Sequence, residues 1–426
     1  MTVPSHLTHN IPVSDWYFCR ITNRGYRTKY YNTGEIPERR LAMIRAFKTE
    51  IDPTSVQLEK ISRTIGVCRY VYNFFLAESK QRYDRGEKYL DAKRFSVWLN
   101  NEYIPEHPEL SWIKEVYSKA VKKSLEDANT AYMRFFCKKS AYPRFKKKGI
   151  SDPKMYFVRN NPSDCQCERH RIKIPSLGWV RLKEKGYLPT TKDGWVIKSG
   201  TIEVRAGRCY VSVLVEVPDS KPDACKGDGI GIDLGIKDFA ILSDGTKYRN
   251  INKTGRMKKL EKQLRRAQRQ LSRKYESNTK KGGATQRNIQ KQKLKVQKLH
   301  QRMDNIRTDY VNKVIAQTVK TKPSYVTIED LHVKNMMKNR HLSKAVAAQK
   351  FYEFRTKLEV KCKSTGIEVR VVDMWYPSSK TCHRCGGIRK DLKLSDRIFR
   401  CSCGYVADRD YNASLNLRDA TAYKLA

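Results

Sequence analysis

Three acidic residues, far apart in the chain, lie where a carboxylate could take part in chemistry. The apolar run 230–232 ends at Asp233, and the apolar run 325–328 ends at Glu329. Asp410 stands at the start of the last helix that the sequence predicts. A carboxylate at the rim of a buried strand loses hydration, and function is a common reason why proteins tolerate that loss.

Together, the three acids predict a divalent-metal site. Carboxylate oxygens suit Mg²⁺, and two such ions about 4 Å apart can activate water and stabilise a leaving 3′ oxygen in phosphodiester hydrolysis. We therefore assign catalysis and magnesium binding to Asp233, Glu329 and Asp410. Each could instead be a surface acid, and Asp410 could simply cap its helix. The alternatives for the third ligand are Asp408 and, more weakly, Asp238 and Asp330.

Four cysteines form a candidate metal site of a different kind. A Cys-x2-Cys pair is followed after fifteen residues by a Cys-x-Cys pair, and the ligands are Cys382, Cys385, Cys401 and Cys403. Four thiolates suit tetrahedral zinc and leave no position for water, so the predicted role is structural. Disulfide bonds and ligation by His383 are the alternatives. A second pair, Cys165-x-Cys167 with His170 nearby, lacks a fourth ligand.

The charge of the chain predicts a nucleic-acid partner. Its 426 residues include 87 lysines and arginines against 44 acids, a net charge of +43. An ordinary metabolic enzyme needs no such field, whereas a phosphate backbone is attracted by it. The 24 tyrosines could stack on bases or ribose. The alternative is that the charged residues serve solubility, but similar numbers of positive and negative residues would serve that purpose without a large excess of positive charge.

The chain shows no apolar run typical of a signal peptide or a membrane span. Its cysteines are mostly scattered singly, as in reducing compartments. We therefore predict a cytoplasmic, nucleoid-associated protein with no membrane partner. Residues 1–42 have no clear periodicity; they are an appendage or an upstream start, and we assign them no role.

The elements expected in the N-terminal half are a strand, a group of helices and a set of short strands. Residues 44–51 predict a strand, and Asp52-Pro53 predicts the cap and first position of a helix. Further helices are expected around 92–100 and over 113–135, and period-two runs in 151–225 predict a β-barrel or curled sheet. Strand 44–51 could belong to that sheet, which would make the helices an insertion.

Basic residues in this half are candidates for nucleic-acid contacts. They lie on the polar faces of the helices and in an extended aromatic segment, and they are Arg69, Lys122, Lys123, Arg144, Lys146 and Lys147. An extended, basic segment suits a phosphate backbone. For each single charge, a solvated surface is the alternative.

The C-terminal half predicts a mixed α/β sheet with a long helical insertion. Residues 251–322 hold 22 basic and 4 acidic residues and form two apolar-seamed helices around Lys281-Gly282-Gly283. We interpret these two helices as the wall of a groove that binds nucleic acid. The alternative is a coiled coil exposed to solvent, but the like charges on its faces would repel each other at helical spacing. A helix over about 342–363 and a strand over 367–375 complete the pattern of a mixed sheet.

Several motifs resemble those of one family, the transposon-encoded TnpB proteins, which resemble the ancestors of type V CRISPR effectors. The RuvC and zinc-ribbon motifs are matched by residues 231–237 (Gly-Ile-Asp-Leu-Gly-Ile-Lys), 328–331, 376–382 (Tyr-Pro-Ser-Ser-Lys-Thr-Cys) and 408–413 (Asp-Arg-Asp-Tyr-Asn-Ala). The N-terminal landmarks of the family are matched by residues 70–73 and 143–145. The resemblance covers about residues 43–417.

The resemblance implies a multidomain α/β fold. An RNase H-like (RuvC) nuclease domain would comprise 226–376 and 405–426, with a zinc ribbon inserted at 377–404. A wedge β-barrel would comprise 43–52 and 141–225, with a helical recognition domain inserted at 53–140. Residues 1–42 would be an extension that the family pattern lacks.

The resemblance also implies an RNA-guided DNA endonuclease. A guide RNA from the transposon end would pair with one strand of a double-stranded DNA target, while the protein reads a short flanking motif. The family's third acid is the second Asp of Asp-Arg-Asp, which favours Asp410. The cofactors would be Mg²⁺ in a two-ion catalytic site and structural Zn²⁺. Alternatives are a nuclease-inactive guided repressor, a CRISPR-array-guided effector, and an actin-like ATPase with a similar Gly-Ile-Asp-Leu-Gly loop.

Overall fold

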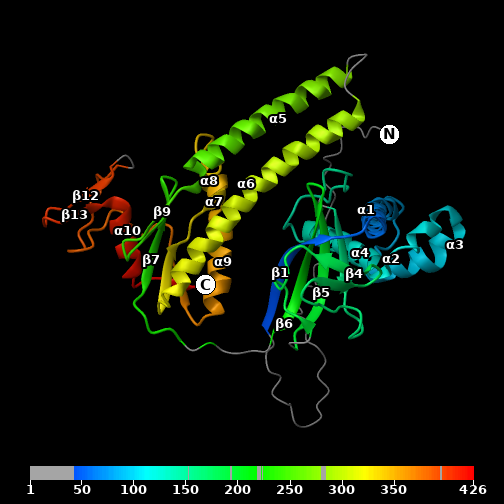
Figure 1. Cartoon of the computed structure of the whole chain (residues 1–426), viewed down its shortest axis with the longest axis horizontal. Helices are drawn as coiled ribbons and strands as arrows, with labels where there is room; N and C mark the ends of the chain where they lie inside the picture. The colour runs from blue at the N-terminus through cyan, green and yellow to red at the C-terminus, as the bar shows by residue number, and fades with distance from the viewer. Residues whose placement is uncertain are drawn as a thin grey trace, which may run out of the picture. The chain divides into compact units, whose positions relative to one another are not determined.

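The computed structural model describes residues 43–151, 153–191, 194–217, 222, 224–279, 285–393 and 396–426. The chain divides into two compact units, Met1–Asp219 and Ser220–Ala426, and Figure 1 traces the elements of each. The expectations for residues 1–42 and for the turn Lys281-Gly282-Gly283 lie outside the described residues. None of the described helices combines the length and the apolar character needed to cross a membrane.

The first unit contains a six-stranded antiparallel sheet in the order β2-β5-β6-β1-β4-β3. Its strands are β1 (Met43–Asp52), β2 (Lys154–Val158), β3 (Arg171–Ile174), β4 (Gly178–Leu182), β5 (Val196–Arg205) and β6 (Arg208–Val217). The alternating residues Val211, Val213 and Val215 of β6 are fully buried in the core. Strands β2 and β3 stand at the two ends of this order, and the outer edge of β3 carries a single bridge between Ile172 and Cys167. The sheet is therefore a half-barrel, which matches the curled sheet of the two expected alternatives and not a closed barrel.

Helices are inserted between β1 and β2. They are α1 (Ser55–Asp84), α2 (Ala92–Trp98), α3 (Ile104–Glu106) and α4 (Ser118–Phe136), with a π-helical turn at Leu99–Tyr103 and a 3-10 turn at Pro108–Ile113. Their core is aromatic, and the rings of Phe75 and Phe95 lie 4.6 Å apart. Because β1 pairs with β6 along almost its whole length, these helices interrupt a single sheet.

The first helix begins two residues later than predicted. Asp52 still belongs to β1, where it pairs with Arg181 of β4, so the expectation that Asp52 caps the helix is wrong. The cap is Thr54, whose hydroxyl accepts from the backbone N–H of Gln57, and the Gln57 side chain accepts from the backbone N–H of Thr54. This reciprocal capping box satisfies two N–H groups that a single aspartate would not.

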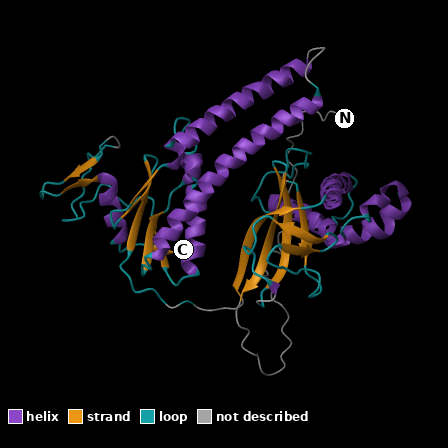
Figure 2. Ribbon diagram, viewed as in Figure 1, coloured by secondary structure: helices purple, strands orange, loops and turns teal. Residues whose placement is uncertain are grey.

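The second unit contains a mixed six-stranded sheet in the order β14-β11-β10-β7-β8-β9. Its strands are β7 (Ile230–Leu234), β8 (Asp238–Leu242), β9 (Lys247–Arg249), β10 (Tyr325–Glu329), β11 (Glu368–Val372) and β14 (Lys424–Leu425). Strands β7, β10 and β11 are parallel, while β8, β9 and β14 are antiparallel to their neighbours. Figure 2 shows this sheet with helices packed against it.

Two long helices, α5 (Gly255–Thr279) and α6 (Gln286–Lys320), follow β9. The predicted apolar seam joins them, with Leu260 and Leu264 of α5 packed against Met303 of α6. The C-terminal half of α6 leaves this seam and joins the core of the sheet through Val311 and Val314. One helix is therefore shared by the hairpin and the sheet.

The single helix expected over 342–363 is broken in two. The pieces are α8 (Ser343–Gln349) and α9 (Phe351–Lys363), separated by Lys350 in the left-handed region at φ 59°. The Lys350 ammonium lies 2.7 Å from both Asp304 and Glu353. These ion pairs fix the side chain at the break. A short helix, α7 (Val333–Met336), precedes α8.

The last elements are a two-stranded ribbon and a helix. Strands β12 (Ile398–Arg400) and β13 (Val406–Asp408) pair antiparallel, and α10 (Arg409–Arg418) follows directly. Helix α10 lies very close to β7, because a Cβ at Gly231 would stand 2.0 Å from the Ser414 carbonyl oxygen. The absence of a side chain at position 231 is what permits this approach.

Candidate active site and metal centre

Two neighbouring parallel strands bring Asp233 and Glu329 to the same edge of the sheet. Ile232 of β7 is in register with Ile328 of β10, so the acids that follow them are also neighbours. Alternation places Asp233 on the same face as Gly231, which is the face that α10 covers. Asp410 lies in the first turn of α10. The three predicted acids thus converge from three elements.

The electrostatics of the three acids reflect this proximity. The pKa of Asp233 is raised well above its ordinary value, first by burial and then by the negative charges of Glu329 and Asp410. Burial also raises the pKa of Glu329, and a hydrogen bond from Ser378 opposes this rise. Neighbouring carboxylates repel one another when all are ionised, and a divalent cation bound between them offsets this repulsion. The donor set consists of hard oxygens, which fits Mg²⁺.

The structure separates the roles of Asp408 and Asp410. The Asp408 carboxylate accepts from the backbone N–H groups of Asp410 and Tyr411 at 3.0 and 3.2 Å, so Asp408 is the helix cap. The alternative that Asp410 caps the helix is therefore wrong. The Asp410 carboxylate instead lies 2.9 Å from the Arg409 guanidinium and 3.6 Å from that of Arg397. This arrangement favours Asp410 over Asp408 as a third ligand.

The two weaker alternatives for the third metal ligand, Asp330 and Asp238, lie outside α10. Asp330 forms an ion pair with Arg355, and Asp238 begins the neighbouring strand β8.

The four cysteines predicted to bind zinc come together. The ligand atoms of Cys382, Cys385, Cys401 and Cys403 all lie within 4.8 Å of one another. The sulfur atoms of Cys382 and Cys403 are 3.7 Å apart, and those of Cys385 and Cys401 are 3.6 Å apart. Thiolates bound tetrahedrally to zinc at about 2.3 Å would be separated by about 3.8 Å. The residues present therefore fit a structural zinc ion.

The surroundings of the thiols agree with metal ligation. Hydrogen bonds from the backbone N–H of Cys403 and from the neighbouring thiols lower the pKa of Cys401 to about 6, while the same closeness to Cys401 raises the pKa of Cys403. The thiols are therefore close enough to share protons, as ligands of one metal ion must be. The His383 ring nitrogen lies 3.7 Å from Asp419 and belongs to a different contact. Cys165 and Cys167 are buried in the apolar core of the first unit, and burial raises the pKa of each to about 11.

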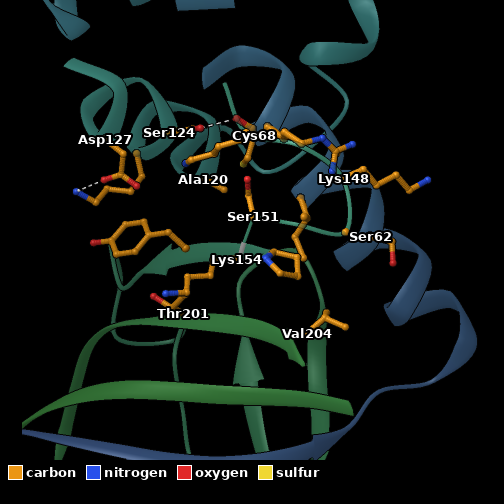
Figure 3. A pocket seen from close by; sticks show the side chains of 18 residues that line it. Ser62, Cys68, Ala120, Ser124, Asp127, Lys148, Ser151, Lys154, Thr201 and Val204 are labelled. Atoms are coloured by element: carbon orange, nitrogen blue, oxygen red, sulfur yellow. Dashed lines mark hydrogen bonds and ion pairs between the residues drawn. The ribbon is translucent and has the colours of Figure 1, made fainter. Parts of the chain in front are cut away.

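The basic residues predicted to contact nucleic acid divide into two groups. Arg69, Lys123 and Lys146 line a cavity of about 610 Å³ between α1, α4 and the half-barrel sheet, shown in Figure 3. Lys122, Arg144 and Lys147 are exposed on the surface and do not line it. Two further cations line the cavity, Lys148 of the extended basic segment and Lys154, and the sequence analysis missed Lys154.

Lys146 is held in place by two residues of the first N-terminal landmark, 70–73. The Asn73 side chain donates to the Lys146 carbonyl at 2.9 Å and accepts from its backbone N–H at 2.7 Å. The Lys146 ammonium lies 3.8 Å from the centre of the Tyr72 ring, and burial lowers its pKa. A partly desolvated lysine that lines a cavity together with four other cations is suited to bind a phosphate.

Curated proteins of known description share most of this sequence. The chain is 34% identical over 392 residues to "Putative RNA-guided DNA endonuclease InsQ" of Escherichia coli K12, covering 88% of this chain and 91% of that protein. The chain belongs to the TnpB (OrfB) family. A protein of Streptomyces pristinaespiralis described as "Putative RNA-guided DNA endonuclease" is 35% identical to this TnpB-family chain over 381 residues, which are 88% of each chain.

Family models of TnpB-type proteins match in three segments. They are described as "Helix-turn-helix domain" (residues 43–88), "Probable transposase" (212–340) and "Cas12f1-like, TNB domain" (351–417). The first segment holds strand β1 and the single helix α1, and not two helices around a turn.

The fold is that of a solved relative. A chain in "Cryo-EM structure of the Cas12f1-sgRNA-target DNA complex" superposes with a TM-score of 0.54 at 16% identity, covering 90% of this chain and 100% of that one. The two chains therefore share a mixed α/β multidomain fold.

Proposed function

We propose that this TnpB-family protein is an RNA-guided DNA endonuclease that hydrolyses phosphodiester bonds at Asp233, Glu329 and Asp410. The observation that carries the proposal is the convergence of these acids from β7, β10 and α10 on one face of one sheet. Relatives that share a third of the sequence along most of its length have the corresponding description.

In this proposal the three carboxylates hold two Mg²⁺ ions. The ions would supply an activated water and stabilisation of the leaving 3′ oxygen. The protein's own part is to place the carboxylates on fixed elements. Glu329 and Asp233 extend from a parallel strand pair, and Asp408 caps α10, which leaves the Asp410 side chain free of that task.

The partners of the proposed enzyme are a guide RNA from the transposon end and a double-stranded DNA target. The +43 net charge attracts both. The cavity cations Arg69, Lys123 and Lys146 are proposed to contact phosphates, and so are the exposed residues Lys122, Arg144 and Lys147. In this assignment the half-barrel is the wedge domain, the inserted helices form the recognition domain, and the sheet of the second unit is the RuvC-like nuclease domain.

The first test is to sequence the RNA that co-purifies with the protein expressed from its own locus. We expect a discrete RNA species that continues into DNA beyond the transposon end. A repeat-derived RNA would indicate a CRISPR-array guide, and random cellular RNA would contradict guided recognition.

The second test replaces Asp233 by alanine in the complex with this RNA. Mg²⁺-dependent cleavage of a target plasmid should fall by at least about a thousandfold, because one of the three carboxylates that would hold the ions is lost. Binding of RNA and target DNA, measured by filter retention, should be unchanged. Asp238→Asn, on the neighbouring strand β8, is the matched control and should still cut. Cleavage by Asp233→Ala at the wild-type rate would show that the active centre lies elsewhere.

A further inference from the structure

The segment that connects β11 to the first zinc ligand touches the candidate active site. We define residues 376–382 as the strap. Ser378 of the strap is 4% exposed, and its hydroxyl donates a hydrogen bond to Oε1 of Glu329. The strap ends at Cys382, the first of the four clustered thiols. A single short segment thus joins the zinc cluster to a proposed magnesium ligand.

Helix α10 holds the strap through two buried amides one helical turn apart. The Asn416 side chain donates to the carbonyl oxygens of Ser378 and Thr381, both at 2.7 Å. The Asn412 side chain donates to the Thr381 carbonyl at 2.7 Å and accepts from the backbone N–H of His383 at 3.1 Å. Asn412 is fully buried and Asn416 is 6% exposed, so losing either set of hydrogen bonds would leave buried polar groups unsatisfied.

The same helix carries Asp410. The hydrogen bonds of Asn412 and Asn416 therefore connect the element that supplies one acid to the segment that orients another. The strap is further fixed by the Tyr376 hydroxyl, which donates to the Asn416 carbonyl at 3.2 Å. Through the strap, Glu329, α10 and the zinc cluster form one continuous hydrogen-bonded unit.

From this geometry we propose that Ser378 is a positioning residue for Glu329, and that the strap makes the divalent-metal affinity of the three acids depend on the zinc cluster. The proposal rests on the function proposed above. A glutamate side chain has several rotatable bonds, and the hydroxyl of Ser378 selects one orientation by binding Oε1. Oε2 then remains available for a divalent cation. Hydrogen-bond partners of metal ligands act in this way in other proteins.

The proposal is tested by the binding of Mn²⁺ to the full-length, zinc-loaded protein without RNA, followed by the electron paramagnetic resonance signal of free Mn²⁺. The Mn²⁺ sites formed by the three acids are identified as those that the wild type has and Asp233→Ala lacks. At these sites we expect Ser378→Ala to bind Mn²⁺ about tenfold or more weakly. Ser378→Thr keeps the hydroxyl and should restore binding.

The adjacent Ser379 offers a matched control. It is half-buried, and its hydroxyl has no hydrogen bond to the described residues, so Ser379→Ala should bind Mn²⁺ as the wild type does. A loss that Ser378→Thr fails to restore, or one that Ser379→Ala reproduces, would overturn the positioning role of Ser378.

The link to the zinc cluster is tested by a double-mutant cycle. Cys403→Ser removes a zinc ligand at the exposed side of the cluster and should weaken Mn²⁺ binding in the wild-type background. In the Ser378→Ala background it should have little further effect, because the connection is already broken. Fully additive losses would overturn the coupling.

Failure of the inference and failure of the proposed function give different results. If wild type and Asp233→Ala bind Mn²⁺ identically, the acids are not a metal site and both proposals fall. If Asp233→Ala loses sites that Ser378→Ala retains at full affinity, the nuclease proposal stands and the positioning role is wrong. Single-turnover cleavage in the RNA complex then provides a second check, since Ser378→Ala should need a higher Mg²⁺ concentration for half-maximal rate.

Discussion

At the scale of single residues, the three acids of the candidate active site lower the free energy of unfolding when no cation is bound. Asp233 is crowded by Glu329 and Asp410, and its raised pKa means that the folded protein holds a proton that the unfolded chain releases. For a group of this kind the free energy of unfolding falls as the pH rises above the ordinary value of 3.8 and continues to fall up to the raised pKa. Each tenfold difference in proton affinity between the folded and the unfolded chain changes the free energy of unfolding by about 1.4 kcal/mol.

Asp233→Asn should therefore be more stable than the wild type at neutral pH when divalent cations are chelated. The gain should shrink as the pH is lowered toward 4, where the wild-type carboxyl is protonated. Each kcal/mol corresponds to about 2–4 °C in melting temperature, which scanning fluorimetry over a pH series can measure. Addition of Mg²⁺ should raise the melting temperature of the wild type and leave that of Asp233→Asn unchanged. An identical pH dependence of the two proteins would contradict the crowding of the acids.

Lys146 presents a second conflict between stability and function. Its ammonium is partly desolvated over the Tyr72 ring, so Lys146→Met should leave the fold as stable or more stable. The same change should weaken RNA or DNA binding by about tenfold, measured by fluorescence anisotropy, because a phosphate partner is lost. Lys147→Met removes an exposed charge outside the cavity and should weaken binding less.

At the scale of elements, the contact of α10 with β7 is the one on which the site depends most. A methyl group at position 231 would meet the Ser414 carbonyl oxygen at 2.0 Å and the Arg418 backbone nitrogen at 2.4 Å, and neither backbone atom can yield without moving the helix. Gly231→Ala should therefore destabilise the second unit by about 3 kcal/mol or more. It should also displace Asp410 and abolish cleavage.

The control for this substitution is Gly255→Ala. Gly255 opens α5, and nothing lies within 4 Å of an added Cβ there. Alanine at this position should be neutral or stabilising by up to about 1 kcal/mol. Chemical denaturation followed by circular dichroism compares the two variants, and a Gly231→Ala protein as stable as Gly255→Ala would disprove the close packing.

The sequence is informative about elements whose signals are local. Apolar runs and alternation predict the strands that carry Asp233 and Glu329, and the spacing of four cysteines predicts the thiol cluster. The cap at Thr54 was missed because Asp52 looks like a cap but is still needed for pairing with β4. The break at Lys350 was missed because its stabilising partners include Asp304, 46 residues away in sequence and on another helix.

The partners of the site residues were also beyond the reach of the sequence. Ser378 lies within a motif that was noticed, yet nothing in its neighbours indicates that its hydroxyl meets Glu329. The strand order of the half-barrel depends likewise on the pairing of distant strands. Such contacts are set by the tertiary arrangement and carry no periodic signal.

At the scale of the whole molecule, charge dominates the expected behaviour. With a net charge of +43, affinity for nucleic acid should fall linearly with salt on a double-logarithmic scale, with a slope of about −0.7 to −0.9 for each phosphate neutralised. Titrations at several salt concentrations measure this slope. Lys146→Met should reduce it by about one, and an unchanged slope would mean that Lys146 does not touch a phosphate.

The 35-residue helix α6 is a rod of about 52 Å with one end in the hairpin and the other in the core of the sheet. At the sheet end, Val311 and Val314 of α6 share a buried core with residues of β7 and β10. A helix that is continuous over this length therefore fixes the position of the α5–α6 pair relative to the two strands that carry Asp233 and Glu329.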